Sequence, residues 1–308
     1  MAKYSQAKLQ RLAVADRIKT LRRMDLGAVS DKHVEWQLRS LLGIGYVTRP
    51  LFLPKPTLFR VRPNRNVSCF MNVRNDLWWP NPEFVGRGRC NEANSPVFYC
   101  ANSDMTAIIE VRPSIGDLLT VLEVSLIDAN QLPLVMTVGI HEFTAKSNPN
   151  YGGTPPELDR AQQLFLKREG ISETNPLLNA YLTEEFMKEI GDDNTDRYKI
   201  TAAIARIMFG QDDFYYEDGT PAPKQEVHGL AYPSIRADKL GANVAFTTTA
   251  ADRLYKPVCT TLCRVEAKAD DTHYTVGILK QSKSIAADGT IEWEIPDPSE
   301  VRLTSPQS

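Results

Sequence analysis

Apolar residues near the N-terminus recur at helical spacing. Val14, Ile18 and Leu21 stand at i, i+4 and i+7, a spacing that places side chains on one face of an α-helix. Leu9 and Leu12 are expected to widen this apolar stripe. The pattern therefore predicts an amphipathic helix at the start of the chain, and its apolar face needs a burial partner.

The same segment is strongly basic. Residues 1–23 hold seven Lys and Arg residues against one acidic residue, Asp16. A basic amphipathic helix can bind a membrane surface, nucleic acid or an acidic partner, although a packed helix with a solvated basic face is the commoner case. Prolines in residues 49–56 exclude regular helix there. We expect a basic helical arm over residues 1–48, followed by an ordered connector.

The next part of the chain favours strands and one short helix. Strand-like runs cover residues 57–62, 96–100, 118–127 and 132–138. After the second run, Ser103 is suited to cap a helix, and Asp104 suits the positive end of its first turn. Glu110 should therefore lie on a short helix directly after a strand.

The middle of the chain changes to a helical pattern. Helical spacing and good helix formers mark residues 157–169, 176–190 and 195–209. Pro176 suits the first turn of the second of these helices. We interpret the stretch at about 141–225 as a helical insertion in a domain that spans residues 57–308.

Strands return after this insertion. Strand-like runs occur at residues 229–236 and 243–247 and through the tail at 261–295, with turn residues near 269–272 and 288–289. The pattern favours an α+β protein with a mixed or antiparallel sheet.

Composition and charge exclude several classes of protein. The 308 residues carry 36 Lys and Arg against 38 Asp and Glu, for a net charge of -2, which argues against a strong nucleic-acid binder. No apolar run approaches the ~20 residues of a membrane span, and the N-terminus has no apolar core of signal-peptide type. The five cysteines are scattered, so we expect reduced thiols in a cytoplasmic protein.

Well-known nucleotide and metal motifs are absent from the sequence. It contains no GxxxxGK[ST] phosphate loop, and no GxGxxG opens a helix, which argues against a P-loop NTPase or a Rossmann dehydrogenase. HExxH, CxxC and GxSxG motifs are absent as well. Cys259, Cys263 and His273 have irregular spacing for zinc and lack a fourth ligand. We expect no bound metal.

Chemistry-bearing residues occur in four separated segments. They are Arg60 and Arg62, the glycine-rich turn at 86–91 with Arg89 and Asn91, Tyr99 with Glu110 eleven residues later, and Tyr232, Ser234 and Arg236. Arginines offer forked donors to a pyrophosphate, and glycines let backbone approach a phosphate. A tyrosine can stack on a flat cationic ring, and a carboxylate can stabilise a cationic ribosyl centre. The set would suit a dinucleotide cation, although each residue alone has a commoner structural role.

The order of these segments resembles the RES-domain family, which is named for an Arg, a Glu and a Ser. The matching positions are Arg60, the GRCN sequence at 88–91, Tyr99, Glu110 and Ser234, with Arg236 close by. The resemblance covers roughly residues 57–127 and 226–250. Cys90 stands where the family prefers an aromatic residue, and Arg62 is as good a chemical candidate as Arg60.

The resemblance implies both a fold and an activity. The fold would be a sheet core of ADP-ribosyltransferase-like type, to which this chain adds its N-terminal arm and helical insertion. The protein would be a toxin of the RES–Xre toxin–antitoxin type that takes NAD+ as its substrate. It would cleave the nicotinamide–ribose bond by hydrolysis or phosphorolysis, without a metal, and a cognate antitoxin would be its partner.

The resemblance also implies a role for each site residue. Glu110 would hydrogen-bond the ribose hydroxyls and stabilise the oxocarbenium-like transition state, and Ser234 would orient Glu110 or the nicotinamide amide. Arg60 and Arg89 would hold phosphates, and Tyr99 would pack on the nicotinamide or its ribose. Further candidates for dinucleotide binding are Asn91, Arg62, Tyr232 and Arg236.

Two alternatives stay open. One is a transferase that attaches ADP-ribose to a protein or nucleic acid. The other, from a different class, is a non-catalytic nucleic-acid-binding protein that uses the basic arm and the arginines between positions 60 and 89. The net charge of -2 argues against the second alternative, and the strand-then-helix setting of Glu110 favours an enzyme. A homo-oligomer is also open, and no membrane partner is expected.

Overall fold

The chain folds into two compact units. The computed structural model describes residues 5–43, 51–53, 57–139, 171–191, 194–210, 226–237 and 241–296. Unit 1 comprises Met1–Leu53, Val85–Ser95 and Pro133–Tyr232, and unit 2 comprises Pro54–Phe84, Pro96–Leu132 and Pro233–Ser308. Within the described ranges, every helix is too short or too polar to cross a bilayer.

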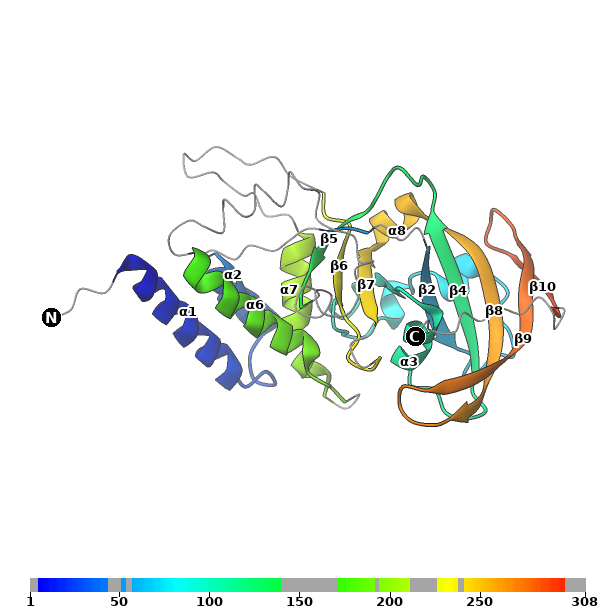
Figure 1. Ribbon diagram of the computed structural model, residues 1–308, viewed down its shortest axis with the longest axis horizontal. Coiled ribbons are helices and arrows are strands. Elements are labelled where there is room, and N and C mark those ends of the chain that lie inside the picture. Colours follow the sequence, from blue (N-terminus) through cyan, green and yellow to red (C-terminus); the bar gives the residue numbers. More distant parts are fainter. Residues whose placement is uncertain are drawn as a thin grey trace. The chain divides into compact units, whose positions relative to one another are not determined.

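Unit 1 combines helices with a small mixed sheet (Figure 1). Its helices are α1 (Gln6–Arg23), α2 (Asp31–Leu42), α6 (Ile171–Met187) and α7 (Lys199–Phe209), and a 3-10 turn, η3 (Thr195–Tyr198), precedes α7. Its strands are β1 (Leu51–Phe52), β5 (Leu134–Thr137) and β6 (Gly229–Pro233). Strand β5 pairs with β1 antiparallel and with β6 parallel.

The N-terminal helices pack within unit 1. Helix α1 packs on α6, and α2 packs on α7. Val14, Ile18 and Leu21 of α1 are buried, so the apolar stripe finds its partner in its own chain. Ser5 and Ser30 cap the two helices by accepting hydrogen bonds from backbone amides three residues later.

The predicted width of this stripe was wrong. Leu9 and Leu12 are each 53% exposed, whereas the three residues of the stripe are buried. At 3.6 residues per turn, positions 9 and 12 fall on the side of α1 opposite to position 14. Only the face of the helix that carries Val14, Ile18 and Leu21 is covered.

The basic face of α1 meets acidic residues of α6. Arg22 forms an ion pair with Glu184, and Arg11 lies 3.7 Å from Glu173. All four side chains are largely exposed, so these pairs add little to stability. The burial of the apolar face is the main attachment of the helix.

The predicted helices of the insertion are present in modified form. Helix α6 begins at Ile171, so Pro176 lies inside the helix and not in its first turn. The expected helix over residues 195–209 divides into η3 and α7. The helix expected over residues 157–169 lies outside the described residues.

Unit 2 is built on a long antiparallel sheet (Figure 1). Its strands are β2 (Thr57–Pro63), β3 (Val97–Ala101), β4 (Leu118–Leu126), β7 (Ala242–Thr247), β8 (Tyr255–Lys268), β9 (Tyr274–Ile285) and β10 (Ile291–Glu294). Neighbouring strands follow the order β7-β3-β2-β4-β8-β9-β10. Shorter elements are η1 (Val73–Leu77), η2 (Pro82–Phe84), α3 (Asp104–Glu110) and α8 (Thr248–Leu254). The predicted tail hairpins are confirmed by the β8–β9 and β9–β10 pairs.

Helix α3 places Glu110 over one face of this sheet. Ser103 caps the helix by accepting a hydrogen bond from the Thr106 amide at 3.1 Å, which confirms the predicted start. Ile108 and Ile109 are buried in a cluster with Leu119 of β4 and with residues of β8. Because both isoleucines precede Glu110 directly, their packing fixes where the last residue of the helix stands.

The predicted fold class is confirmed. The protein is α+β, and its strands pair in both parallel and antiparallel fashion. The ADP-ribosyltransferase-like type of the sheet stays a prediction.

Candidate functional site

Glu110 is the centre of a cluster of polar side chains in unit 2. It is half-buried at the end of α3. Its Oε1 atom accepts a hydrogen bond from Ser234 Oγ at 2.5 Å and another from Asn243 Nδ2 at 2.7 Å. The structure therefore brings together Glu110 and Ser234, two residues that lie 124 positions apart in the sequence.

The orientation of the Ser234 hydroxyl is set by its other contact. Ser234 is fully buried, and its Oγ accepts a hydrogen bond from the Ala237 amide at 3.1 Å. Because an amide already donates to this oxygen, the hydroxyl hydrogen is available for Glu110. Ser234 thus acts as a donor of fixed direction.

Arg236 holds the backbone of the same residue. Its Nη1 atom donates a hydrogen bond to the carbonyl oxygen of Glu110. The last carbonyls of a helix lack partners within the helix, and a cation is favourable at this end. The side chain expected to bind a dinucleotide therefore caps α3, and its role toward a dinucleotide stays a prediction.

The turn that carries Ser234 approaches α3 very closely. The Ser234 amide donates to the Gly241 carbonyl at 2.8 Å. A Cβ atom at Gly241 would lie 2.3 Å from Oγ1 and 2.6 Å from Cγ2 of Thr106. Thr106 is buried and short, so it cannot swing away, and glycine is required at this position.

Gly241→Ala should therefore lower the free energy of unfolding by ~1–3 kcal/mol, the usual cost of overpacking. It should also displace Ser234 from Glu110. Thermal unfolding measures the first effect. The double variant Gly241→Ala/Thr106→Ala removes the clashing atoms and should recover part of the loss. If the double variant loses as much free energy of unfolding as the two single variants together, the clash between position 241 and Thr106 is not the cause.

Tyr99 lies on the sheet face that carries Asn243. On the β3–β7 ladder, Tyr99 is opposite Ala245, and Ala101 is opposite Asn243. Side chains two residues apart share a face. Phe59 is opposite Ala101 on β2 and packs in the cluster with α3. The Tyr99 ring is thus placed on the face that α3 covers.

Arg60 points to the other face of the sheet. Its neighbour Phe59 packs under α3, and successive side chains of a strand alternate. The guanidinium lies 5.6 Å from the centre of the Phe98 ring, and it donates from Nε to the Leu77 carbonyl at 2.9 Å and from Nη1 to the Tyr99 carbonyl at 3.1 Å. Burial lowers the pKa of Arg60. Its guanidinium contacts the backbone and makes no contact with the Glu110 carboxylate.

Arg62 shares this second face, two residues along β2. It donates from Nη1 to the Asp76 carbonyl, and its guanidinium lies 5.3 Å from the centre of the Phe70 ring. The structure therefore brings neither Arg60 nor Arg62 to Glu110. The sequence could not separate Arg60 from Arg62 as a candidate for phosphate binding, because both side chains lie on the same face of β2.

Three other predicted site residues belong to unit 1. Arg89 donates from Nη1 to the Phe186 carbonyl at 2.6 Å and from Nη2 to the Lys188 carbonyl at 3.0 Å, which is a favourable place for a cation at the end of α6. Asn91 is buried and closes its own turn through Nδ2. Tyr232 is buried with its ring 5.5 Å from that of Phe186.

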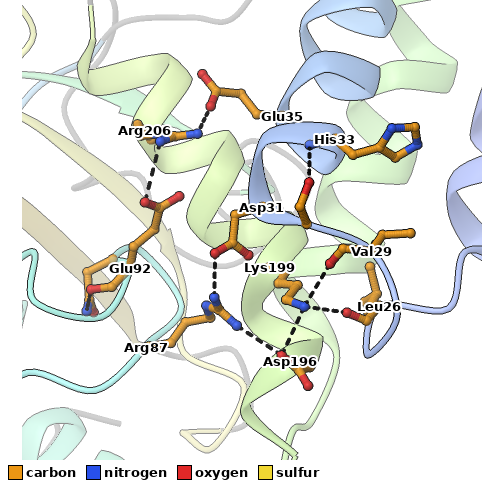
Figure 2. A network of polar contacts seen from close by, with 12 residues as sticks. Leu26, Val29, Asp31, His33, Glu35, Arg87, Glu92, Asp196, Lys199 and Arg206 are labelled. Atoms are coloured by element: carbon orange, nitrogen blue, oxygen red, sulfur yellow. Dashed lines mark hydrogen bonds and ion pairs between the residues drawn. The ribbon is translucent and has the colours of Figure 1, made fainter.

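Arg87 anchors the glycine-rich turn to the N-terminal helices. Figure 2 shows its guanidinium between two carboxylates, with Nη2 at 2.7 Å from Asp31 Oδ2 and Nη1 at 3.1 Å from Asp196 Oδ1. The N-terminal arm therefore supplies Asp31, one of the two carboxylates that hold the turn on which Arg89 lies.

Two further cations complete this network (Figure 2). Lys199 donates to two carbonyls of the α1–α2 connection at 2.5 Å and 3.0 Å and lies 3.2 Å from Asp196. Arg206 of α7 pairs with Glu35 of α2 and lies 3.4 Å from Glu92. Helix α7 thereby holds both the arm and the glycine-rich turn.

Arg87→Gln should lower the midpoint of thermal unfolding by several degrees, because two carboxylates would lose a charged donor that is largely buried. The matched control is Arg11→Gln, which breaks one exposed ion pair of α1 and should change the midpoint by about a degree or less. Equal midpoint shifts in the two variants would show that the network contributes no more than a surface pair.

Asn243 was missed by the sequence reasoning. It is one polar residue in an otherwise apolar strand run, Ala242–Phe246, and it is buried. A buried polar side chain in such a run needs a hydrogen-bond partner. That requirement was the signal that could have identified it.

The cysteines and histidine considered for zinc have other neighbours. Cys263 is buried with Sγ 3.6 Å from the Leu119 carbonyl, and burial raises the pKa of its thiol to about 12. His273 contacts Asp270. In the ranges that the structure describes, no three His, Cys, Asp or Glu residues gather in a metal-binding group.

The fold and the cluster together define an α+β protein with an oriented carboxylate at the end of a helix. The RES-domain pattern matches residues 57–266. Because this match spans well over half of the chain and includes Arg60, Tyr99, Glu110 and Ser234, the chain belongs to the RES-domain family. A comparison with curated proteins found no match.

Proposed function

We propose that the protein consumes NAD+ by cleaving its nicotinamide–ribose bond, with Glu110 as the carboxylate at the reacting centre. The observation that carries the proposal is the pair of donors, Ser234 and Asn243, on one oxygen of Glu110. This leaves the other oxygen, Oε2, for a substrate, since no described residue donates to it. Membership of the RES-domain family supports an NAD-related role.

The chemistry needs little beyond an oriented negative charge. Nicotinamide leaves with both electrons of the C–N bond and becomes neutral, while positive charge develops on the ribose. A fixed carboxylate stabilises that charge electrostatically. A water oxygen then bonds to the anomeric carbon and releases a proton, which yields ADP-ribose; a phosphate oxygen in its place yields the 1-phosphate.

Tyr99 and the arginines have proposed roles in binding. The Tyr99 ring lies on the face that α3 covers, which would suit packing against the nicotinamide or its ribose. Arg60 and Arg89 each donate to backbone carbonyls, but every terminal guanidinium nitrogen carries two hydrogens. A second hydrogen is therefore left on each such nitrogen. Contact of these arginines with a phosphate stays a proposal, which for Arg60 requires that the phosphate reach the sheet face opposite to Tyr99.

Mass spectrometry after incubation of the full chain with NAD+ tests the proposal. Free nicotinamide together with ADP-ribose supports hydrolysis, and ADP-ribose 1-phosphate in phosphate buffer supports phosphorolysis. A mass increase on added protein or nucleic acid would support the alternative transferase. Intact NAD+ in every condition would reject NAD+ as substrate.

A protein that depletes NAD+ would harm the cell that makes it. We therefore propose that it acts as a toxin and that a cognate antitoxin restrains it. Growth arrest on expression of the wild-type protein, and normal growth with Glu110→Gln at equal protein level, would support this role. Equal arrest with both would show that any toxicity is independent of Glu110.

A further inference from the structure

The second donor to Glu110 has no role in the family pattern recognised from the sequence. We infer that Asn243 is a positioning residue that, together with Ser234, holds Oε1 of Glu110 so that Oε2 faces the ribose of NAD+. The inference rests on the proposed function and assigns to Asn243 no contact with the substrate.

Both donors converge on one atom. Ser234 Oγ is 2.5 Å and Asn243 Nδ2 is 2.7 Å from Glu110 Oε1. The donors come from different elements, one from the turn after β6 and the other from β7. Two donors on one oxygen oppose rotation of the carboxylate, which a single donor would permit.

Asn243 is itself held in place by the sheet. It is opposite Ala101 on the β3–β7 ladder. The preceding residue, Ala242, exchanges hydrogen bonds with Asn102: its carbonyl accepts from the Asn102 amide, and its amide donates to Asn102 Oδ1, both at 3.0 Å. These two hydrogen bonds fix the register of β7 against β3, and with it the position of the Asn243 side-chain amide.

An apolar residue would suit this position better if packing alone mattered. Asn243 is only 7% exposed, and its neighbours Ala242, Val244 and Ala245 are buried and apolar. Burying an amide is unfavourable unless it is hydrogen-bonded. The carboxylate of Glu110 provides that partner, which gives a physical reason for asparagine at this position.

The consequence for the reaction is geometric. A charge stabilises a transition state best when it is already in place, because no reorganisation is then needed during the reaction. Loss of one donor would let the carboxylate rotate among orientations, few of which present Oε2 to the ribose. Binding of the rest of NAD+ would be unaffected, so the loss should appear in kcat and not in KM.

The test uses Asn243→Ala and Asn243→Leu in the full chain, with NAD+ as substrate. Both should lower kcat by about 10- to 100-fold, a usual cost of misplaced catalytic groups, with KM changed by less than about threefold. Leucine restores volume but not the donor, so a merely structural role would be rescued by Asn243→Leu and a positioning role would not.

Asn64 provides the matched control. It is a buried asparagine of unit 2, 8% exposed, whose Oδ1 accepts from Thr120 Oγ1 at 2.9 Å and which does not contact Glu110. Asn64→Leu should keep wild-type kcat even where it lowers the unfolding midpoint. The double variant Ser234→Ala/Asn243→Ala should be non-additive, because the donors share one oxygen.

The outcomes separate this inference from the proposed function. If Asn243→Leu keeps kcat within about threefold of wild type while Glu110→Gln loses activity, the positioning role is overturned and the proposed function stands. If the loss of kcat in Ser234→Ala/Asn243→Ala equals the product of the losses in the two single variants, the two donors do not share the task of holding Oε1. If the wild-type protein leaves NAD+ intact, the proposed function fails, and the inference fails with it.

Discussion

Replacing Glu110 with glutamine should slow the release of nicotinamide from NAD+ by ~10²–10³-fold, the range expected when one preorganised electrostatic stabiliser of a transition state is removed. Glutamine keeps the size of the side chain, and its amide oxygen can still accept from Ser234 and Asn243. Only the negative charge is lost. The rate of nicotinamide release at saturating NAD+ measures the effect.

Glu123→Gln is the matched control for this experiment. Glu123 lies on β4 in the same row of the sheet as Asn243, three strand spacings or roughly 14 Å away. Burial, and secondarily the charge of Asp104, raises the pKa of Glu123, so neutral glutamine should be well tolerated there. Glu110→Gln with more than about a tenth of the wild-type rate, or equal losses in both variants, would remove Glu110 from the reacting centre.

Arg60→Lys should destabilise unit 2 more than any other conservative change in the candidate set. Asn102 follows β3 directly, and its amide donates to the Ala242 carbonyl of β7. Backbone N–H and C=O groups of successive residues in a strand point alternately to the two neighbouring strands. Those of Tyr99, three residues earlier, therefore point to β2. The described β2–β3 ladder consists of the Phe59–Ala101 pair alone. Arg60 therefore supplies the donor that the ladder lacks, and it also serves the Leu77 carbonyl at the end of η1.

Lysine is a poor substitute here, because its compact ammonium lacks the planar fork with which Arg60 reaches both carbonyls from two separate nitrogens. A buried polar group left without a partner costs ~1–3 kcal/mol, so the unfolding midpoint should fall by roughly 2–12 °C for a domain of this size. Arg62→Lys is the control, because Arg62 serves one carbonyl on the same face. An equal midpoint for Arg60→Lys and wild type would contradict the assigned structural role.

Calorimetric titration with NAD+ then separates stability from binding for Arg60. It is performed at a temperature at which Arg60→Lys is folded, with Arg89→Lys titrated alongside. Weaker binding in either variant would support the proposed phosphate contact. Unchanged affinity in both would place the phosphates elsewhere.

Local features of the fold were readable from the sequence. The start of α3 at Ser103 depends on one side chain and an amide three residues away, so a short pattern contains all the information. The same holds for the tail hairpins. The position of Glu110 after a strand and a single short helix followed from these local signals.

Features that depend on distant partners were not readable. The side of α1 on which Leu9 lies is set by packing on α6, and the face to which Arg60 points is set by the pairing of β2 with its neighbours. Likewise, Asn243 can be recognised as a partner of Glu110 only in the folded protein, where β7 brings together two residues that are 133 positions apart in the sequence. The order of segments along the chain indicated candidate residues, but not which of them are in contact.

In the proposed reaction, the negative charge of Glu110 is what makes cleavage of the nicotinamide–ribose bond fast. A proton NMR time course of NAD+ with equal concentrations of folded wild-type protein and Glu110→Gln tests it most directly, because the resonances of bound and free nicotinamide differ. Free nicotinamide should accumulate with the wild-type protein and stay near the enzyme-free level with Glu110→Gln. Unchanged NAD+ with the wild-type protein, or equal nicotinamide release by both, would contradict it.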